Sequence, residues 1–152
     1  MKKTCLILLS LLSCLMTGCK EVHEAVDISF IYFMLDDGTS QTVVTSDVNA
    51  INTYYVYLSS KTLSRPLTVT YEIEVGDGLV EGTDYRILTE GNTLTFQPGV
   101  YDMPIRIQWL PNPVSADKDN RVIVRLVRND HGLTMGMPGP DAKNRELIIV
   151  KQ

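Results

Sequence analysis

Two sets of residues have the types and spacing that acid–base or nucleophilic catalysis uses. Glu72 and Glu74 lie two residues apart, which on an extended strand separates their positions by about 7 Å, and carboxylates at such a separation can hydrolyse glycosides. We prefer the alternative that both occupy the polar side of a strand together with Thr68 and Thr70. His131 stands in an Asp-His-Gly turn, where a Ser-His-Asp triad would need partners from distant segments, and no nucleophile-elbow glycine pattern is present. We therefore expect no enzymatic activity and assign no catalytic residue.

The acidic segment Asp117–Asn120 begins like the calcium-binding loop of an EF-hand. Such a loop needs glycine at its sixth position and a bidentate glutamate at its twelfth, whereas this sequence has Val122 and Arg128 there. The only two histidines, His23 and His131, do not have the spacing of a metal-ligand pair. We therefore expect no metal site and no cofactor.

Two tyrosines have the position to contact a ligand without catalysis. If the segment around them is a strand, Tyr55 and Tyr57 face away from Tyr54, Val56 and Leu58. Exposed tyrosine rings on a sheet can stack on sugars, so one interpretation is a glycan-binding face. The other interpretation is structural: strands are rich in tyrosine in any case, and a second sheet covers the two rings.

The N-terminus has the features of a secretory signal. Lys2 and Lys3 precede a charge-free, leucine-rich stretch, residues 4–18. This stretch is shorter than the roughly 20 apolar residues of a membrane-spanning helix and closes with small residues, as signal peptides do. We therefore expect a cleaved leader rather than a membrane helix.

The end of this leader, Leu15-Met16-Thr17-Gly18-Cys19, resembles the lipobox of bacterial lipoproteins. The resemblance implies a signal peptide of residues 1–18 and lipidation of the Cys19 thiol, which becomes the first residue of the mature chain. Cys5 and Cys14 are then discarded with the leader, so no disulfide remains. Two or more acyl chains hold a protein stably at a membrane, and we expect the membrane to be a partner through this lipid.

Residues 19–26 would form a short tether, which spans at most about 25 Å when extended. Its start, Lys20-Glu21, resembles the export signals of surface-displayed lipoproteins of Bacteroides-type bacteria. The resemblance implies an outer-membrane protein on the cell surface. A plain solvated linker, with the domain on the periplasmic face, is the alternative.

Length and charge limit the remaining possibilities. The chain has 152 residues, enough for one domain. It carries 14 basic and 18 acidic residues, a net charge of −4. Because a nucleic-acid-binding protein needs a basic face, we expect no nucleic-acid partner.

Residues 27–152 carry strand signals, and no sustained helical period occurs in them. Alternation is clearest from Leu67 to Val75, where apolar residues at odd positions alternate with threonine and glutamate. Trp109 is expected in the core or at the end of a sheet. Further strands are expected at residues 28–35, 54–58, 85–88, 94–96, 103–109, 122–126 and 147–150, with a short edge strand at 42–45.

Turn residues separate these strands, as at Asp36-Asp37-Gly38. Pro66 stands where a strand can begin, and Pro104 inside a strand predicts a sheet edge or a bulge. The loops 111–120 and 129–144 are the longest, and the second contains too many glycines and prolines for regular structure. We interpret both as crossover connections, with a functional role as the alternative. Seven to nine short strands without helices predict one antiparallel β-sandwich.

Two motifs within this region, Gly82-Thr83-Asp84-Tyr85 and Leu94-Thr95-Phe96-Gln97-Pro98-Gly99, resemble those of Calx-beta and related immunoglobulin-like modules. The likeness covers about residues 54–150 and implies an immunoglobulin-like, Calx-beta-like sandwich. It also raises a calcium site, with Asp84 at a family acidic position and Asp117 and Asp119 near the family's acidic loop. Calcium needs six to eight oxygens, and residues 110–113, Leu-Pro-Asn-Pro, stand where further acidic residues are expected.

These observations predict a non-enzymatic, lipid-anchored binding or structural accessory module with a protein or glycan partner. A glycan-binding accessory protein of a polysaccharide-uptake system is the first alternative. A calcium-stabilised adhesive module is the second.

Overall fold

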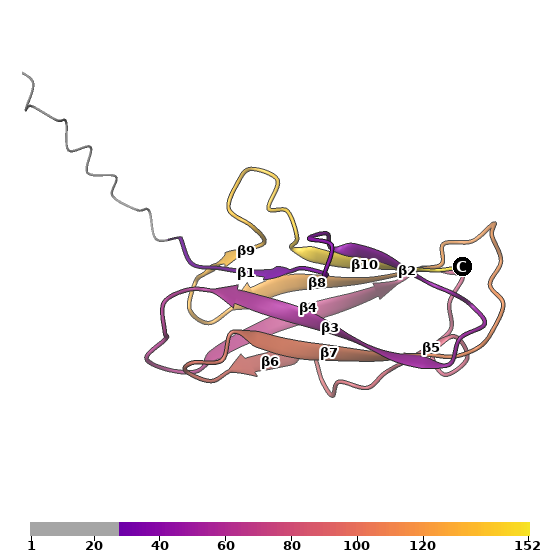
Figure 1. Ribbon diagram of the computed structural model, residues 1–152, viewed down its shortest axis with the longest axis horizontal. Helices are drawn as coiled ribbons and strands as arrows, with labels where there is room; N and C mark the ends of the chain where they lie inside the picture. Colours follow the sequence, from indigo (N-terminus) through magenta and orange to yellow (C-terminus); the bar gives the residue numbers. More distant parts are fainter. Residues whose placement is uncertain (1–27) are drawn as a thin grey trace, which may run out of the picture.

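The structure, a computed structural model, describes residues 28–152, which form two five-stranded sheets packed face to face (Figure 1). No residue of this range is helical, and hence the range contains no helix that could span a membrane. The strands are β1 (Phe30–Phe33), β2 (Gln41–Val44), β3 (Ala50–Ser59), β4 (Leu67–Val75), β5 (Tyr85–Ile87), β6 (Thr93–Phe96), β7 (Asp102–Trp109), β8 (Arg121–Asn129), β9 (Thr134–Met135) and β10 (Glu146–Lys151).

The first sheet has the strand order β5-β7-β3-β1-β9, and the second has β2-β10-β8-β4-β6. The predicted β-sandwich is confirmed, and most neighbouring strands are antiparallel. Two pairs are parallel, β1 with β9 and β2 with β10, and the prediction did not include them. Residues 34–40 carry the chain from the first sheet to the second, with Gly38 at a φ of 81° in the turn. β1 and β2, which follow each other in the chain, therefore belong to different sheets.

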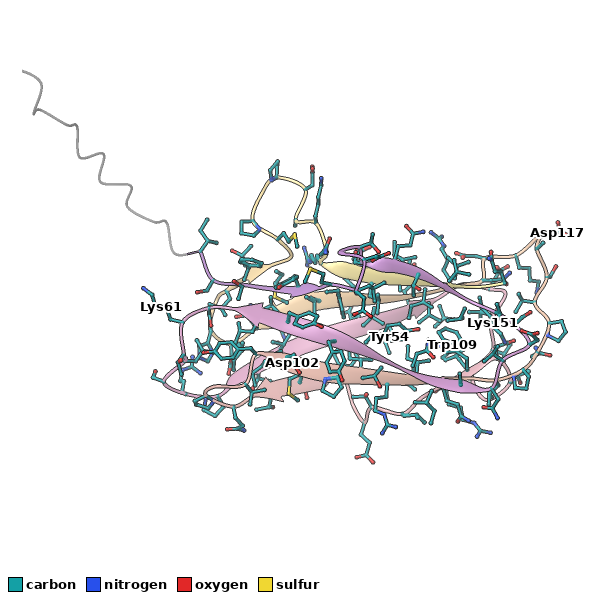
Figure 2. All side chains as sticks on the ribbon, in the orientation of Figure 1. Tyr54, Lys61, Asp102, Trp109, Asp117 and Lys151 are labelled. Carbon is teal, nitrogen blue, oxygen red and sulfur yellow. The ribbon has the colours of Figure 1, made fainter. Side chains whose placement is uncertain are left out.

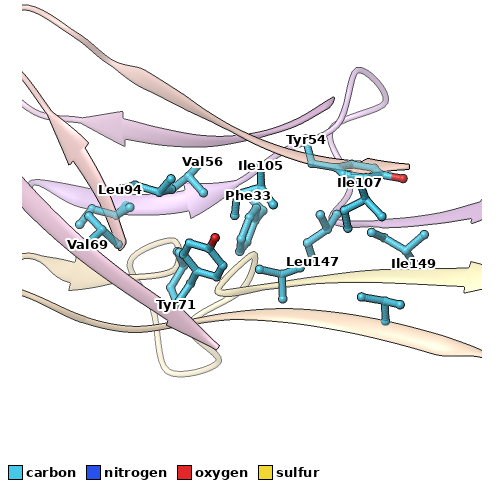
Figure 3. Packing of buried hydrophobic residues seen from close by; sticks show 14 of the residues in the cluster. Phe33, Tyr54, Val56, Val69, Tyr71, Leu94, Ile105, Ile107, Leu147 and Ile149 are labelled. Carbon is cyan, nitrogen blue, oxygen red and sulfur yellow. The ribbon is translucent and has the colours of Figure 1, made fainter. Parts of the chain in front are cut away.

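The core lies between the two sheets and follows the alternation of the strands. On β4, Leu67, Val69 and Tyr71 are fully buried while Glu72 is exposed. Figure 3 shows the side chains of both sheets meeting in one apolar layer. Trp109 is buried at the end of β7, as predicted, and its indole N–H donates to the Tyr54 hydroxyl at 3.3 Å.

Strand limits agree with the predicted segments most closely where alternation is strongest. β4 has the predicted bounds, and it begins directly after Pro66 as expected. The strand predicted at 54–58 is longer, because β3 starts at Ala50. The prediction that residues 129–144 hold no regular structure was wrong: β9 forms there on β1. It lasts two residues, and Gly136, at a φ of 88°, follows it directly.

Candidate functional site

The carboxylates considered for acid–base chemistry lie on the exposed side of β4. Arg125 Nη2 on β8 donates to Glu74 Oε2 at 3.3 Å, and Arg125 Nε donates to Glu146 Oε1 on β10 at 2.5 Å. Glu72 is exposed on the same strand. The two glutamates thus occupy the polar face that the alternation predicts, and Glu74 takes part in a cross-strand ion pair.

His131 lies in the turn after β8, where its Nδ1 is 2.8 Å from Asp130 Oδ1. The same oxygen accepts a hydrogen bond from the Thr68 amide at 2.9 Å, and Arg65 Nη1 lies 3.5 Å from Asp130 Oδ2. The hydrogen bond with His131, followed by that of Thr68, lowers the pKa of Asp130 to about 2. These contacts fasten the turn to the start of β4, which gives His131 a structural setting.

A buried ion pair closes one end of the sandwich. Lys151 is 0% exposed and Asp84 is 3% exposed. Lys151 Nζ donates to Asp84 Oδ1 at 3.0 Å and to the carbonyl oxygens of Asp84 and Leu110 at 3.2 and 2.9 Å. The Asp84 carboxylate also accepts hydrogen bonds from Asn112 Nδ2 and the Val80 amide, both at 2.8 Å. Every charge in this cluster therefore has partners.

The pKa of Asp84 reflects two opposing effects. Burial alone would raise it, because a carboxylate loses hydration in the interior. The hydrogen bonds from Asn112, Val80 and Lys151, together with the ammonium charge, outweigh burial and lower the pKa of Asp84. Asp84 is accordingly ionised at neutral pH and neutralised by the chain itself.

The three acidic residues that the Calx-beta resemblance raised as calcium ligands have different surroundings. Asp84 binds Lys151 inside the sandwich, whereas Asp117 lies on the outer part of the loop after β7 (Figure 2). Asp119 binds Arg121 through both Nε and Nη2 at 2.8 Å. Across residues 28–152, no group of three or more histidine, cysteine, aspartate or glutamate side chains is arranged to hold a metal ion.

Sequence reasoning missed Lys151 as the partner of Asp84, although one signal for it was available. Leu147 and Ile149 face the core, and Lys151 follows them at the next inward position of β10. A lysine at an inward position needs a buried counter-charge. The predicted strand ended at Val150, one residue too early to raise this question.

A strip of four aromatic rings follows the outer face of the first sheet. Phe30 and Tyr32 come from β1, and Tyr57 and Tyr55 come from β3. Successive ring centroids along the strip are 5.1, 5.7 and 6.2 Å apart. Tyr55 is exposed and the other three are half-buried. The prediction that Tyr55 and Tyr57 face away from the core is confirmed, and no described strand covers them.

Two carboxylates lie near Tyr57 of this strip, hereafter the tyrosine strip, and exposed Arg106 of β7 lies on the same face of the sheet. Partial burial, followed by the charges of Asp102 and Asp36, raises the pKa of Tyr57. Asp36 and Asp37 lie in the turn after β1 and are exposed. Carboxylates beside the Tyr57 ring repel anions from that part of the strip.

A groove runs beside the strip, between β3 and the segment that leads into β2. It has a cavity of about 620 Å³ lined by the turn 34–37, by Thr42 and by residues 51–55 and Tyr57 of β3. A second cavity of about 230 Å³ is lined by Val43, Val48 and Trp109, among others. Asn52 lines both cavities, so the two adjoin at this residue, and we treat them together. We call the two together the β2–β3 groove.

Several predicted features lie outside the described residues. These are the signal peptide 1–18, the lipidation site Cys19, the tether 19–26 and His23. They remain predictions from the sequence.

Comparison with known proteins establishes the fold. The sequence matches no family model and no curated protein. The structure resembles the crystal structure of CBD12 from CALX1.2 with a TM-score of 0.58 and 20% sequence identity, over 81% of this chain. The match spans 43% of that larger chain. The predicted Calx-beta-like β-sandwich is therefore confirmed at the level of fold, which by itself fixes no function.

Proposed function

We propose that this protein is a non-enzymatic, lipid-anchored accessory module that binds its ligand through the outer face of the first sheet. The tyrosine strip is the observation that carries the proposal, because four adjoining rings on an uncovered sheet face provide a ready contact surface. The Calx-beta-like fold is consistent with a binding module. Of the groups considered for catalysis, Glu74 forms an ion pair with Arg125 and His131 contacts Asp130 in its turn.

The anchor follows from the lipobox resemblance at Cys19. Each buried methylene contributes about 0.8 kcal/mol to membrane binding, so several acyl chains bind almost irreversibly. We place the protein in the outer membrane and on the cell surface, on the basis of the tether start Lys20-Glu21.

Palmitate labelling tests the anchor, and protease treatment of intact cells tests the location. The wild-type chain should incorporate radiolabelled palmitate and a Cys19→Ala chain should not. External protease should remove the domain from whole cells. Labelling of both chains, or of neither, contradicts the anchor, and full protection from protease indicates the periplasmic face.

A glycan is the ligand class that the tyrosine strip favours. Tyrosine rings stack on the apolar faces of sugars, while the hydroxyl groups offer hydrogen bonds. Partial burial, followed by the charges of Asp102 and Asp36, raises the pKa of Tyr57. The same two carboxylates would repel anionic polymers. We therefore propose uncharged polysaccharides as ligands, consistent with an accessory role in polysaccharide uptake.

Calorimetric titration with a panel of neutral and acidic polysaccharides tests this proposal. A neutral member should bind, and Tyr57→Ala should weaken that binding at least tenfold. Tyr101→Ala is the matched control, because Tyr101 is an exposed tyrosine outside the strip whose hydroxyl is 2.9 Å from that of Thr62. Binding of acidic polymers alone, or equal losses in the two variants, would contradict the proposal.

A further inference from the structure

Residues 50–55, six of the ten residues of β3, have one edge that no strand of residues 28–152 covers. β7 pairs with β3 from Ala50 to Tyr57, but β1 pairs only with residues 56–59 of β3. The Leu58 amide donates to the Tyr101 carbonyl on the β7 side. Because backbone groups alternate in direction along an antiparallel strand, those of Ile51 and Thr53 point to the uncovered side.

The outer edge of β2, which no strand in the described part of the chain covers, borders the same groove. The carbonyls of Ser40 and Val44 accept hydrogen bonds from β10 and from Gln152 just after it. By the same alternation the backbone groups of Val43 point away from β10. Side chains of β2 and β3 line both cavities of the β2–β3 groove. Two strand edges with outward-pointing backbone groups therefore border these adjoining cavities.

Another exposed edge in this sheet is blocked, which makes the open one distinctive. β7 extends past the end of β5. On the β5 side of β7, the Arg106 carbonyl accepts a hydrogen bond from the Leu88 amide, just beyond β5. Pro104 occupies the next position that faces the same way. A proline there has no N–H to offer and prevents pairing with another chain. The open stretch of β3, residues 50–55, contains no proline.

The chemistry of the β2–β3 groove indicates what can fill it. Val43, Val48 and Ile51 are 41–51% exposed around it, which provides apolar contacts. Asp36 and Asp37 line the larger cavity, and none of the basic residues within 28–152 lines either cavity. Backbone donors and acceptors at residues 51 and 53 repeat about every 7 Å, the spacing that another extended polypeptide supplies.

We propose that the β2–β3 groove binds an extended segment of a partner protein, which adds to the first sheet as a strand on β3. The open stretch accommodates about six residues, or roughly 20 Å of strand. Backbone hydrogen bonds to Ile51 and Thr53 hold the segment, as in other cases of strand addition. Its alternate side chains are apolar, and a lysine or arginine at one end faces Asp36 and Asp37. The inference does not depend on glycan binding, because it rests on a strand edge rather than on the tyrosine strip.

A synthetic peptide, Lys-Val-Thr-Val-Thr-Val-Thr-Val, is a suitable probe for the full-length chain in detergent. Binding is measured by fluorescence anisotropy, and amide hydrogen exchange identifies the protected backbone. We expect saturable binding that slows exchange at Ile51 and Thr53. No saturable binding, or protection confined to other strands, overturns the proposal.

Thr53→Pro removes one amide at the open edge and leaves the hydrogen bonds to β7 in place, so it should weaken peptide binding at least tenfold. The matched control is Thr62→Pro, which introduces a proline in the turn after β3 and away from the groove. Thr45→Pro cannot serve, because Thr45 lines the groove. Urea unfolding checks that each variant folds. Equal binding by wild type and folded Thr53→Pro overturns the proposal.

Peptide chemistry gives a test that needs no folded variant. One peptide carries N-methyl groups on its valine amides and a second carries them on its threonine amides. If the peptide pairs with β3 along one edge, one of the two loses binding at least tenfold and the other retains it. Equal binding by both overturns the proposal, as does a dimer of the chain that Thr53→Pro dissociates, because the occupant would then be a second copy.

Discussion

Replacing Lys151 with methionine removes the ammonium group from the buried ion pair and keeps an unbranched side chain of similar length in the core. The ammonium bonds three oxygens at 2.9–3.2 Å, two of them backbone carbonyls. After the substitution the Asp84 carboxylate retains its bonds from Asn112 and Val80. It loses its counter-charge, and two carbonyls lose their donor.

The expected cost is about 3 kcal/mol of the free energy of unfolding. Breaking a buried ion pair by removing one partner costs about 3–5 kcal/mol, because the other charge remains buried. We expect a cost near the lower end of this range, because the Asp84 carboxylate keeps the hydrogen bonds from Asn112 and Val80. A hydrogen bond to a charged group contributes about 1.5–3 kcal/mol. A domain has about 5–15 kcal/mol in total, so the variant should fold with a much lower urea midpoint.

Acid should reduce the difference between Lys151→Met and wild type. The lowered pKa of Asp84 means that the pair stabilises the wild type above the unfolded pKa of about 4 and loses this effect as the pH falls through the folded value. In the variant, a protonated Asp84 needs no counter-charge. The loss of stability should therefore be largest near about pH 7 and should shrink toward about pH 3.

Urea unfolding at several pH values measures both effects, with Lys118→Met as the control. Lys118 is exposed in the loop after β7, and its substitution should change stability by less than about 0.5 kcal/mol. If Lys151→Met costs no more than Lys118→Met, or if its deficit grows on acidification, the reasoning about the buried pair is wrong.

Three further outcomes follow from contacts described above. The Asp130 carboxyl should titrate at about pH 2 by NMR. The stability it contributes should be present above about pH 4 and disappear as the pH falls toward 2. Titration near the ordinary pKa of an aspartate would contradict the turn geometry. Gly76→Ala should lower stability by about 1–3 kcal/mol in urea, because a Cβ there collides with the Asp119 carbonyl, and a neutral effect would show that the loop yields. Tyr54→Phe leaves the indole N–H of Trp109 without its acceptor and should cost about 1–3 kcal/mol by thermal unfolding, so an unchanged Tm would contradict that hydrogen bond.

The sequence predicted most where one strand faces water on one side and the core on the other. The alternation of β4 set both its limits and its buried face, because a period of two has only one way to hide its apolar residues. The same parity correctly placed Tyr55 and Tyr57 on the outer face. Pro104 was expected at an edge or bulge, and it lies on β7 beyond the end of β5.

Features that depend on distant segments were not predictable in the same way. β9 consists of two residues that become a strand only through parallel pairing with β1, more than a hundred positions earlier. The partnership of Asp84 with Lys151 likewise joins a turn to the last strand. Neither feature has a local sequence pattern. The alternation of β10 could have predicted that Lys151 points inward, but not which residue pairs with it.

The way β1 enters the fold also determines how the domain resists force. β1 begins near one end of the long axis and β10 ends near the other (Figure 1). Tension applied through both ends therefore runs along the strands and at right angles to the hydrogen bonds that join β1 to β3. Those hydrogen bonds are loaded in shear, so they must break together rather than one at a time. A domain held at its N-terminal end would therefore resist mechanical unfolding.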